Sequence, residues 1–285
     1  MDLTDLLNEA SIDPANTLVL RHRPRSPQLR RVLPWLAAEQ AEVFNAYQQT
    51  QYKRVQGQME RASHIVALIG DEPGRAVFVG IYENQGSRMT DLRARQAIPA
   101  HRELTKYGHP DEEGECLWFH LVLTEYFSEW SGKLILKWPP PEVAWSRWCS
   151  RNEFSIEAIL EESLLTHVIP SWHELVLTWN ELQAVPRSLK DRLSQWRGVY
   201  FILDTTDGRG YVGSAYGKEN IHGRWQNYAK TGHGGNKRLR TRESENLRFS
   251  ILQRVSPDTE PSEVIELEAT WKKRLHTRDH GLNDN

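Results

Sequence analysis

Short apolar runs rich in β-branched residues characterise the first part of the chain. They predict strands at 64–70, 75–83, 117–127 and 132–138. A helix is expected over 35–61, because apolar side chains recur there three or four positions apart and then give way to polar residues. The basic stretch 21–31 is interrupted by two prolines and is expected to be a loop.

The pattern as a whole predicts two domains of α+β class. Residues 1–165 are expected to form a β-rich domain with helical flanks, ending in a small α/β appendage at 142–163. The segment 166–190 is expected to connect this domain to a second one at 191–285. Within the connection, 173–179 has the composition of a strand, which would allow it to pair with the second domain.

A β-hairpin is predicted early in the second domain. The apolar run 198–204 is followed by an Asp-Gly turn and then by a second run at 211–215. Side chains alternate between the two faces of a strand, so Tyr200 and Tyr211 are expected to meet across the pair. Paired tyrosines in a hairpin more often serve packing than chemistry, and the hairpin alone does not separate these readings.

Two helices are predicted after the hairpin. The first should run over 218–230 and end near Gly232. Arg224 and Tyr228 are four positions apart in it and therefore share one face. The last helix should run over 262–276.

A carboxylate lies on the apolar side of this last helix. At about 100° per residue, Glu268 falls among the apolar positions. These positions are Val264, Leu267, Trp271 and Leu275. A carboxylate that faces inward is costly unless it is paired or binds a metal. Two interpretations remain open, a metal site and a buried ion pair, for which Arg224 is a candidate partner.

Charge adds a local feature to an otherwise ordinary composition. The chain has 39% hydrophobic and 26% charged residues and a net charge of −2, which is typical of a globular protein. Residues 224–254, however, hold eight Lys and Arg against two Glu. A phosphate backbone could dock on such a segment, although a solvated basic face would have the same composition.

The sequence also limits the location of the protein. No apolar run approaches the ~18 residues of a membrane span, and the first residues lack the pattern of a secretory signal. Cys116 and Cys149 are too few for a disulfide framework or a four-ligand zinc site. We therefore expect a cytoplasmic protein without membrane contact.

Several short motifs occur in a fixed order across roughly 172–285. They are GVY at 198–200, YVG at 211–213 after ten intervening residues, Arg224, Tyr228, Glu268 and Asn283. In this order they resemble the GIY-YIG nuclease family, with valine in place of isoleucine in both triplets. TGHGGN at 231–236 and GLN at 281–283 further resemble a bacterial subgroup of that family.

The resemblance implies a small antiparallel sheet flanked by helices and a divalent-metal-dependent cut in DNA. It assigns the metal, Mg²⁺ or Mn²⁺, to Glu268 and the scissile phosphate to Arg224. Tyr200 becomes the general base, with its pKa lowered by the arginine and the metal. The family pattern also implies supporting roles for Tyr211, Tyr228 and Asn283, with Asn285 as an alternative to Asn283.

Residues between the two helices are candidate DNA contacts. They are His233, Asn236, Lys237, Arg238 and Arg240. The glycines around them also fit a structured loop, and for His233 and Asn236 that interpretation remains equally open.

The function of the first domain is less determined. Tryptophans gather in it, at Trp118, Trp130, Trp138, Trp145 and Trp148. A pocket of such rings could stack a base turned out of DNA, which would suit a restriction or defence enzyme that selects modified double-stranded DNA. The same residues could simply form a core. A repair or mobile-element nuclease, a non-catalytic binding module and an RNA-cutting toxin remain alternatives, and a homodimer is expected if both strands are cut.

Overall fold

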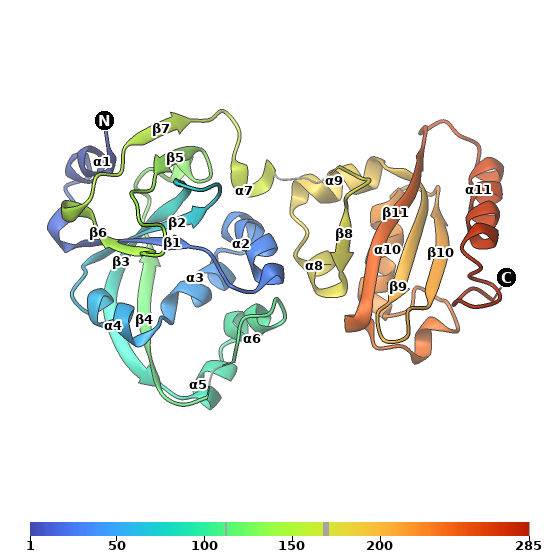
Figure 1. Ribbon diagram of the computed structural model, residues 1–285, viewed down its shortest axis with the longest axis horizontal. Coiled ribbons are helices and arrows are strands. Elements are labelled where there is room, and N and C mark those ends of the chain that lie inside the picture. The colour runs from blue at the N-terminus through green and yellow to red at the C-terminus, as the bar shows by residue number, and fades with distance from the viewer. Residues whose placement is uncertain (112, 168–170, 285) are drawn as a thin grey trace. The chain divides into compact units, whose positions relative to one another are not determined.

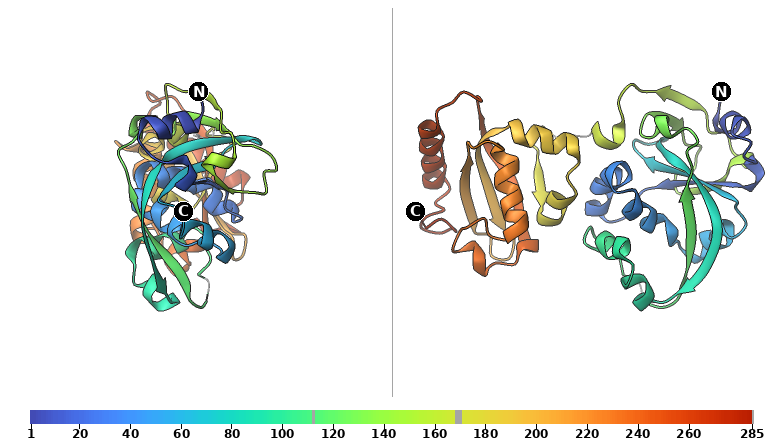
Figure 2. Two further views of the ribbon diagram at one scale, coloured as in Figure 1. Left: turned by 90° about the vertical axis from the view of Figure 1, so that its left-hand side faces the viewer. Right: turned by 180° about the vertical axis from the view of Figure 1, so that it is seen from behind.

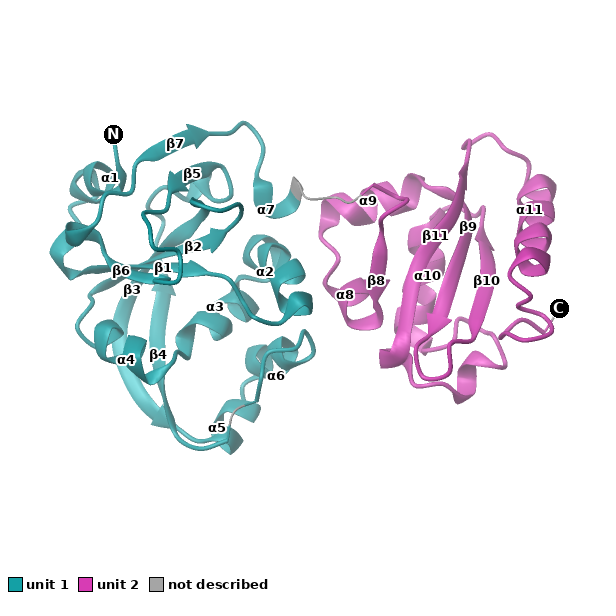
Figure 3. Cartoon of the chain, viewed as in Figure 1, with its two compact units in different colours: residues 1–168 teal, residues 169–285 magenta. Residues whose placement is uncertain are grey.

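The chain divides into two compact units, Met1–Val168 and Ile169–Asn285 (Figure 3). The structure is a computed structural model and describes residues 1–111, 113–167 and 171–284. Each unit has a sheet and a core of its own, so each is described by itself.

Unit 1 contains a seven-stranded mixed sheet (Figure 1). The strands are β1 (Thr17–His22), β2 (His64–Gly70), β3 (Arg75–Thr90), β4 (Cys116–Leu123), β5 (Leu134–Lys137), β6 (Ser146–Trp148) and β7 (Ile156–Ile159). They run in the order β6-β1-β2-β3-β5-β7, and β4 also pairs with β3. Only β1 and β2 are parallel. The β-rich domain expected from the sequence is confirmed, but β3 continues beyond the predicted 75–83, because its second half pairs with β4.

The helices of unit 1 differ from the sequence prediction at the start of the chain. They are α1 (Leu3–Glu9), α2 (Pro27–Glu39), α3 (Ala41–Gln49), α4 (Lys53–Met59), α5 (Leu92–Gln96), α6 (Pro99–Thr105) and α7 (Leu164–His167). The expected loop at 21–31 is wrong except at 23–26, because β1 continues to His22 and α2 begins at Pro27. Ser26 caps the helix, and Pro27 fits its first turn, where no amide donor is needed. The single helix expected over 35–61 is three helices, broken at Gln40 and again at 50–52.

Both faces of the unit 1 sheet are buried at its two parallel strands, β1 and β2. Neighbouring residues of a strand point to opposite faces. Val19 and Val66 join a cluster with Phe78 and residues of α1, while Leu18 and Ile65, which alternate with them, are also fully buried. Beside the sheet, α3 contacts both α2 and α6, and α3 and α4 contact β4.

Unit 2 contains a four-stranded antiparallel sheet in the order β10-β9-β11-β8. Its strands are β8 (Val176–Thr178), β9 (Arg197–Asp204), β10 (Gly210–Ala215) and β11 (Leu247–Val255). Its helices are α8 (Trp179–Ala184), α9 (Arg187–Gln195), α10 (Asn220–Thr231) and α11 (Pro261–Arg274). Seen from behind in Figure 2, α10 (orange) runs across the sheet, and both α10 and α11 contact β9 and β10. A small antiparallel sheet with flanking helices is the predicted architecture.

The segment 166–190, expected as a connection, carries β8, α8 and the first residues of α9. Because β8 pairs with β11, the described residues from 171 onward add an edge strand to the sheet of unit 2. Residues 168–170 of this segment lie outside the described residues. Within the part of the chain that the structure describes, no helix has the length and apolarity needed to cross a membrane.

A buried histidine makes unit 1 sensitive to acid. His22 at the end of β1 is 1% exposed, and its Nε2 lies 3.3 Å from Gln48 Oε1. Burial lowers the pKa of His22 from 6.5 to about 4, against the opposing effect of that hydrogen bond. The unfolded chain therefore takes up a proton near pH 6.5, which the folded chain does not accept until about pH 4. The contribution to stability is present above pH 6.5 and is lost as the pH falls to about 4.

We expect a change from pH 7 to pH 4.5 to lower the unfolding free energy of unit 1 by roughly 2–3 kcal/mol through His22 alone. Urea unfolding at the two pH values should show a smaller loss in His22→Gln than in the parent. His120→Gln, at an exposed position of the same unit, should keep the loss of the parent. An equal loss in all three proteins would contradict the assignment.

Candidate functional site

The β9–β10 hairpin brings Tyr200 over a glycine. Tyr200 pairs with Gly213, and Tyr211 pairs with Ile202. Tyr200 is fully buried. A Cβ atom at position 213 would lie 2.4 Å from the Tyr200 hydroxyl, so only glycine leaves room for this ring. The third residue of the YVG motif is therefore needed for the close approach of the tyrosine.

Helix α10 supplies the partners of the buried hydroxyl. Arg224 and Tyr228 lie one turn apart, as predicted. Arg224 Nε donates to the Tyr200 hydroxyl at 3.2 Å, and the hydroxyls of Tyr200 and Tyr228 are also 3.2 Å apart. The rings of Tyr211 and Tyr228 are in edge contact, with centroids 6.2 Å apart. Tyr228 thus contacts both hairpin tyrosines, and four of the predicted residues form one cluster.

The charge state of Tyr200 differs from the expectation. Burial raises the pKa of Tyr200 well above its usual range, the nearby Tyr211 raises it further, and Arg224 lowers it by less. The pKa of Tyr228 is likewise raised, mainly by burial. The prediction that Arg224 brings the Tyr200 phenol toward the working range is wrong as far as the charges of the protein are concerned, because loss of solvation outweighs the guanidinium.

Glu268 faces inward from α11, as predicted, but its partner is a lysine. The side chain is 16% exposed, and its Oε1 lies 2.8 Å from Lys272 Nζ, one helical turn away. The Ser214 hydroxyl donates to Oε2. Arg224, the candidate partner from the sequence, is bound to Tyr200 instead. Leu275, expected on the same apolar side, is 39% exposed because the helix ends at Arg274.

The tyrosine cluster and the carboxylate approach β10 from opposite faces. Gly213 lies under Tyr200, and Ser214, the next residue, therefore points to the other face and holds Glu268. β10 is an edge strand of the sheet. The tyrosine cluster and Glu268 thus contact neighbouring residues of this edge strand. Among the described residues, no hydrogen bond or ion pair joins the cluster to Glu268 directly.

Asn283 binds the unpaired edge of the same strand, β10. Its Oδ1 accepts from Val212 N at 2.9 Å, and its Nδ2 donates to Val212 O at 2.9 Å. Asn283 is 1% exposed. The side-chain amide thereby takes the place of a neighbouring peptide group next to Tyr211. The alternative, Asn285, lies outside the described residues.

The loop after α10 uses most of its polar residues internally. His233 Nδ1 accepts from Gly235 N at 2.9 Å, and Asn236 Oδ1 accepts from Leu239 N at 3.0 Å. Asn236 Nδ2 also donates to the carbonyl of Leu282 at 3.3 Å. For both residues the structure gives a loop-forming role, which was one of the two interpretations left open.

The cations of this loop fall into two groups. Arg238 donates to the carbonyl of Gly281 at 3.0 Å and pairs with Asp284. Lys237 and Arg240 are exposed, and no hydrogen bond or ion pair from either one occurs among the described residues. These two side chains are the most available to a phosphate.

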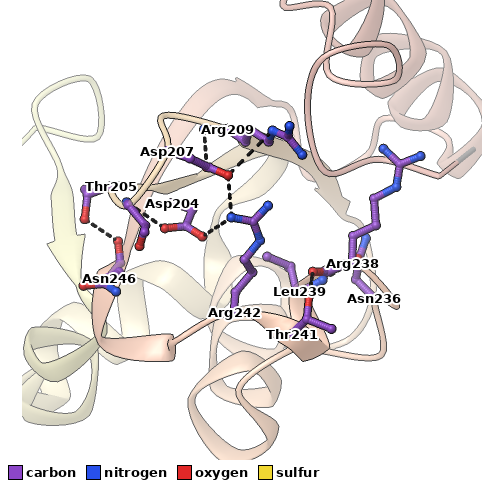
Figure 4. Close-up of polar contacts among 11 residues, drawn as sticks. Asp204, Thr205, Asp207, Arg209, Asn236, Arg238, Leu239, Thr241, Arg242 and Asn246 are labelled. Atoms are coloured by element: carbon purple, nitrogen blue, oxygen red, sulfur yellow. Dashed lines mark hydrogen bonds and ion pairs between the residues drawn. The ribbon is translucent and has the colours of Figure 1, made fainter.

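A further arginine, Arg242, fixes the loop to the hairpin turn (Figure 4). It lies 3.1 Å from the buried carboxylate of Asp204 and 2.6 Å from Asp207. Some basic residues of the segment 224–254 therefore form ion pairs within the domain and do not contribute to an exposed basic surface. The sequence did not indicate this pairing, because the partners are more than 30 positions apart.

The only donors that the described residues of this site offer to a metal ion are oxygen atoms. Within the described residues, no three His, Cys, Asp or Glu side chains gather as a metal-binding group. Glu268, with the neighbouring Ser214 hydroxyl, presents hard oxygen atoms and is partly exposed. This fits Mg²⁺, which retains several waters and uses one or two carboxylates together with substrate phosphates. The sequence did not indicate Ser214 or Lys272 as partners of Glu268, although Lys272 stands four positions after it.

Comparison with known families identifies the class of this unit. Residues 197–283 match the GIY-YIG catalytic domain, so the C-terminal domain belongs to that family. The second unit therefore carries a nuclease domain of the GIY-YIG type, which indicates endonuclease activity.

Two solved structures are similar to the chain. One is a mutant catalytic domain of the intron endonuclease I-TevI, with 26% identity over 32% of this chain and 94% of that chain, at a TM-score of 0.27. The other is the catalytic domain of the homing endonuclease I-TevI, with 26% identity over 31% of this chain and 98% of that chain, also at 0.27. No curated protein matches the chain.

We expect Gly213→Ala to disrupt the tyrosine cluster. The new methyl group would lie 2.4 Å from the Tyr200 hydroxyl, so the ring must move away from Arg224 and Tyr228. Cleavage of plasmid DNA should fall by about 10²-fold, as expected when a site loses its geometry. Gly217→Ala is the matched control, because no atom lies within 4 Å of its added Cβ. Equal cleavage by the two variants would contradict the requirement for glycine.

Proposed function

We propose that the chain is a divalent-metal-dependent endonuclease that cuts double-stranded DNA. The observation that carries the proposal is the buried contact of Tyr200 with Arg224 and Tyr228, within a domain of known nuclease family. Glu268 contacts Ser214, the residue of β10 that follows Gly213, from the other face of the sheet. Together they provide a cation for phosphate and a carboxylate for a metal.

The exposure of these side chains suggests how they divide the work. Tyr200 and Tyr228 are completely or almost completely buried, whereas Tyr211 and Arg224 are partly exposed. Arg224 would then bind the phosphate through its guanidinium, held in place at Nε by the Tyr200 hydroxyl. Tyr211, on the same face of the hairpin, would hydrogen-bond the attacking water. Tyr200 retains its proton at neutral pH, because burial raises its pKa, and acts here as a support for Arg224.

Glu268 would hold the metal, with Ser214 orienting one carboxylate oxygen. A bound divalent cation would neutralise charge on the phosphate and lower the pKa of a coordinated water. Lys272 Nζ lies 2.8 Å from the other carboxylate oxygen, Glu268 Oε1. For a metal ion to bind both carboxylate oxygens, the ammonium group would have to move away or share this oxygen. Lys237 and Arg240 would contact the backbone of DNA outside the reacting phosphate.

A role in restriction or defence, with target selection by unit 1, fits a chain in which the nuclease domain is accompanied by a second folded unit. One catalytic site per chain cuts one strand at a time, so double-strand cleavage would need two chains or two successive nicks. Phage plating on cells that express the parent chain or Glu268→Gln tests the defence role. Equal plating on both would leave repair or mobility as the better interpretation.

We expect Glu268→Gln to reduce DNA cleavage in Mg²⁺ by about 10²–10³-fold, because the substituted side chain loses the charge that holds the cation. Chelation of divalent ions should abolish cleavage by the parent. Glu266→Gln, on the exposed side of the same helix, should cleave like the parent. Activity retained by Glu268→Gln would overturn the metal assignment.

Lys272→Met should increase the affinity of the DNA-free protein for Mn²⁺. The ammonium group competes with the cation for Glu268 Oε1, and removing one unit charge at this distance changes affinity by about tenfold or more. Electron paramagnetic resonance of Mn²⁺ measures the effect without reference to activity. Lys273→Met, at an exposed position next in sequence, is the control. Unchanged or weaker Mn²⁺ binding by Lys272→Met would argue against this competition.

A further inference from the structure

Unit 1 contains a large cavity that no part of the proposed cleavage chemistry uses. Its volume is about 840 Å³, within the ~300–1,000 Å³ typical of small-molecule sites. Its lining includes Tyr47, Tyr52, His101 and His109, together with the cations Arg25 and Lys53. The walls come from segments far apart in the sequence, between residues 24 and 116.

One side of the cavity is built from flat rings in edge-to-face contact. Tyr47 and His109 have centroids 5.8 Å apart, and His109 and His101 are 5.9 Å apart. His101 in turn contacts Trp118 at 6.0 Å. Burial lowers the pKa of His109 to about 4, so this ring is uncharged at neutral pH. The wall therefore combines uncharged aromatic surface with ring nitrogens, the combination that recognises a planar heterocycle.

A histidine that borders the cavity retains an unused polar atom. His101 is 2% exposed, and its Nε2 lies 3.2 Å from Asp111 Oδ1. Its Nδ1 is buried and has no hydrogen-bond partner in the part of the chain that the structure describes. In the tautomer that donates from Nε2 to Asp111, the Nδ1 atom is an acceptor. Because His101 belongs to the lining of the cavity, this acceptor is a candidate partner for an N–H group of a ligand.

A buried arginine holds another part of the lining in position. Arg95, 4% exposed, donates from one nitrogen to the carbonyls of Thr90 and Gly114, at 3.2 and 3.3 Å. These hydrogen bonds fix the backbone at Thr90 and Gly114 without a ligand. Arg25 and Lys53 are exposed at its lining, where they can contact phosphates, and the carboxylates of Glu113 and Glu115 can accept from amino groups.

We propose that this cavity receives a single nucleobase turned out of a DNA duplex. The ring would lie against Tyr47, His109 and the more exposed Tyr52, with an N–H group directed to His101. Arg25 and Lys53 would hold the flanking phosphates. The inference rests on the proposed function, because DNA is the substrate it assumes. It also changes the expected composition of the pocket: tyrosine and histidine line it, while Trp118 supports it from behind and Trp138 is a core residue.

Binding experiments on the full chain test the cavity separately from cleavage. Glu268→Gln protein without divalent metal is titrated with short duplexes by fluorescence anisotropy. The duplexes carry only unmodified bases, or one 5-methylcytosine, 5-hydroxymethylcytosine or N6-methyladenine, or an unmodified base opposite an abasic site. Because an unpaired base is cheaper to turn out, the last duplex should bind more tightly than its paired counterpart, and we expect a preference of about tenfold.

Two cavity variants and one matched control decide the outcome. In the same background, Tyr52→Ala and His101→Gln should reduce the preference to less than about twofold. Tyr52 is 57% exposed, so its truncation leaves the core intact. Tyr126→Ala removes a tyrosine of similar exposure, 46%, outside the cavity lining, and should keep the preference.

Three results would overturn the inference. They are no preference for any duplex, a preference that survives both cavity variants, and binding of free deoxynucleosides with no preference among duplexes. Cleavage in Mg²⁺ is scored independently with the chain that retains Glu268. A preference that depends on Tyr52 without any cleavage would refute the proposed nuclease function but not the base pocket, and cleavage without such a preference would do the reverse.

Discussion

The arrangement of unit 2 depends on one buried hydroxyl. A polar group removed from water is costly unless it is hydrogen-bonded, so the Tyr200 hydroxyl requires partners inside the domain. Arg224 and Tyr228 provide them from one face of α10, and the absence of a side chain at Gly213 provides the space. The hairpin and the helix are thereby locked in a single relative position, and the guanidinium comes to rest with its remaining nitrogens available.

The carboxylate of Glu268 is held in place by other contacts than the Tyr200 hydroxyl. Glu268 is fixed by Ser214 and by Lys272, both partners within its own neighbourhood, so its position does not depend on the tyrosine cluster. A buried ion pair contributes little net stability, because desolvation of the charges offsets their attraction. The pair instead keeps a charged acid in place near the edge of the sheet. The two halves of the site are positioned independently, and the backbone of β10 sets the separation between them.

Local features of the fold could be predicted from the sequence, and contacts across it could not. Tyr200, Arg224 and Tyr228 follow from alternation in a strand and from four-residue spacing in a helix, and both rules act over a few residues. The placement of Glu268 on the other face of β10 follows from strand register and helix docking, which spacing does not encode. The raised pKa of Tyr200 reflects complete burial, which a motif cannot show. The cavity of unit 1 is assembled from distant segments, so tryptophan content was a poor guide to its lining.

The amide of Asn283 has a consequence for how two nuclease domains can associate. An exposed edge strand is a template on which a second chain can extend the sheet. By occupying both the N–H and the carbonyl of Val212, Asn283 removes the pairing groups at the middle of the β10 edge. Two copies of this domain therefore cannot join their sheets edge to edge there. Association of two chains on one DNA molecule would therefore have to use another surface, with the two sheets kept separate.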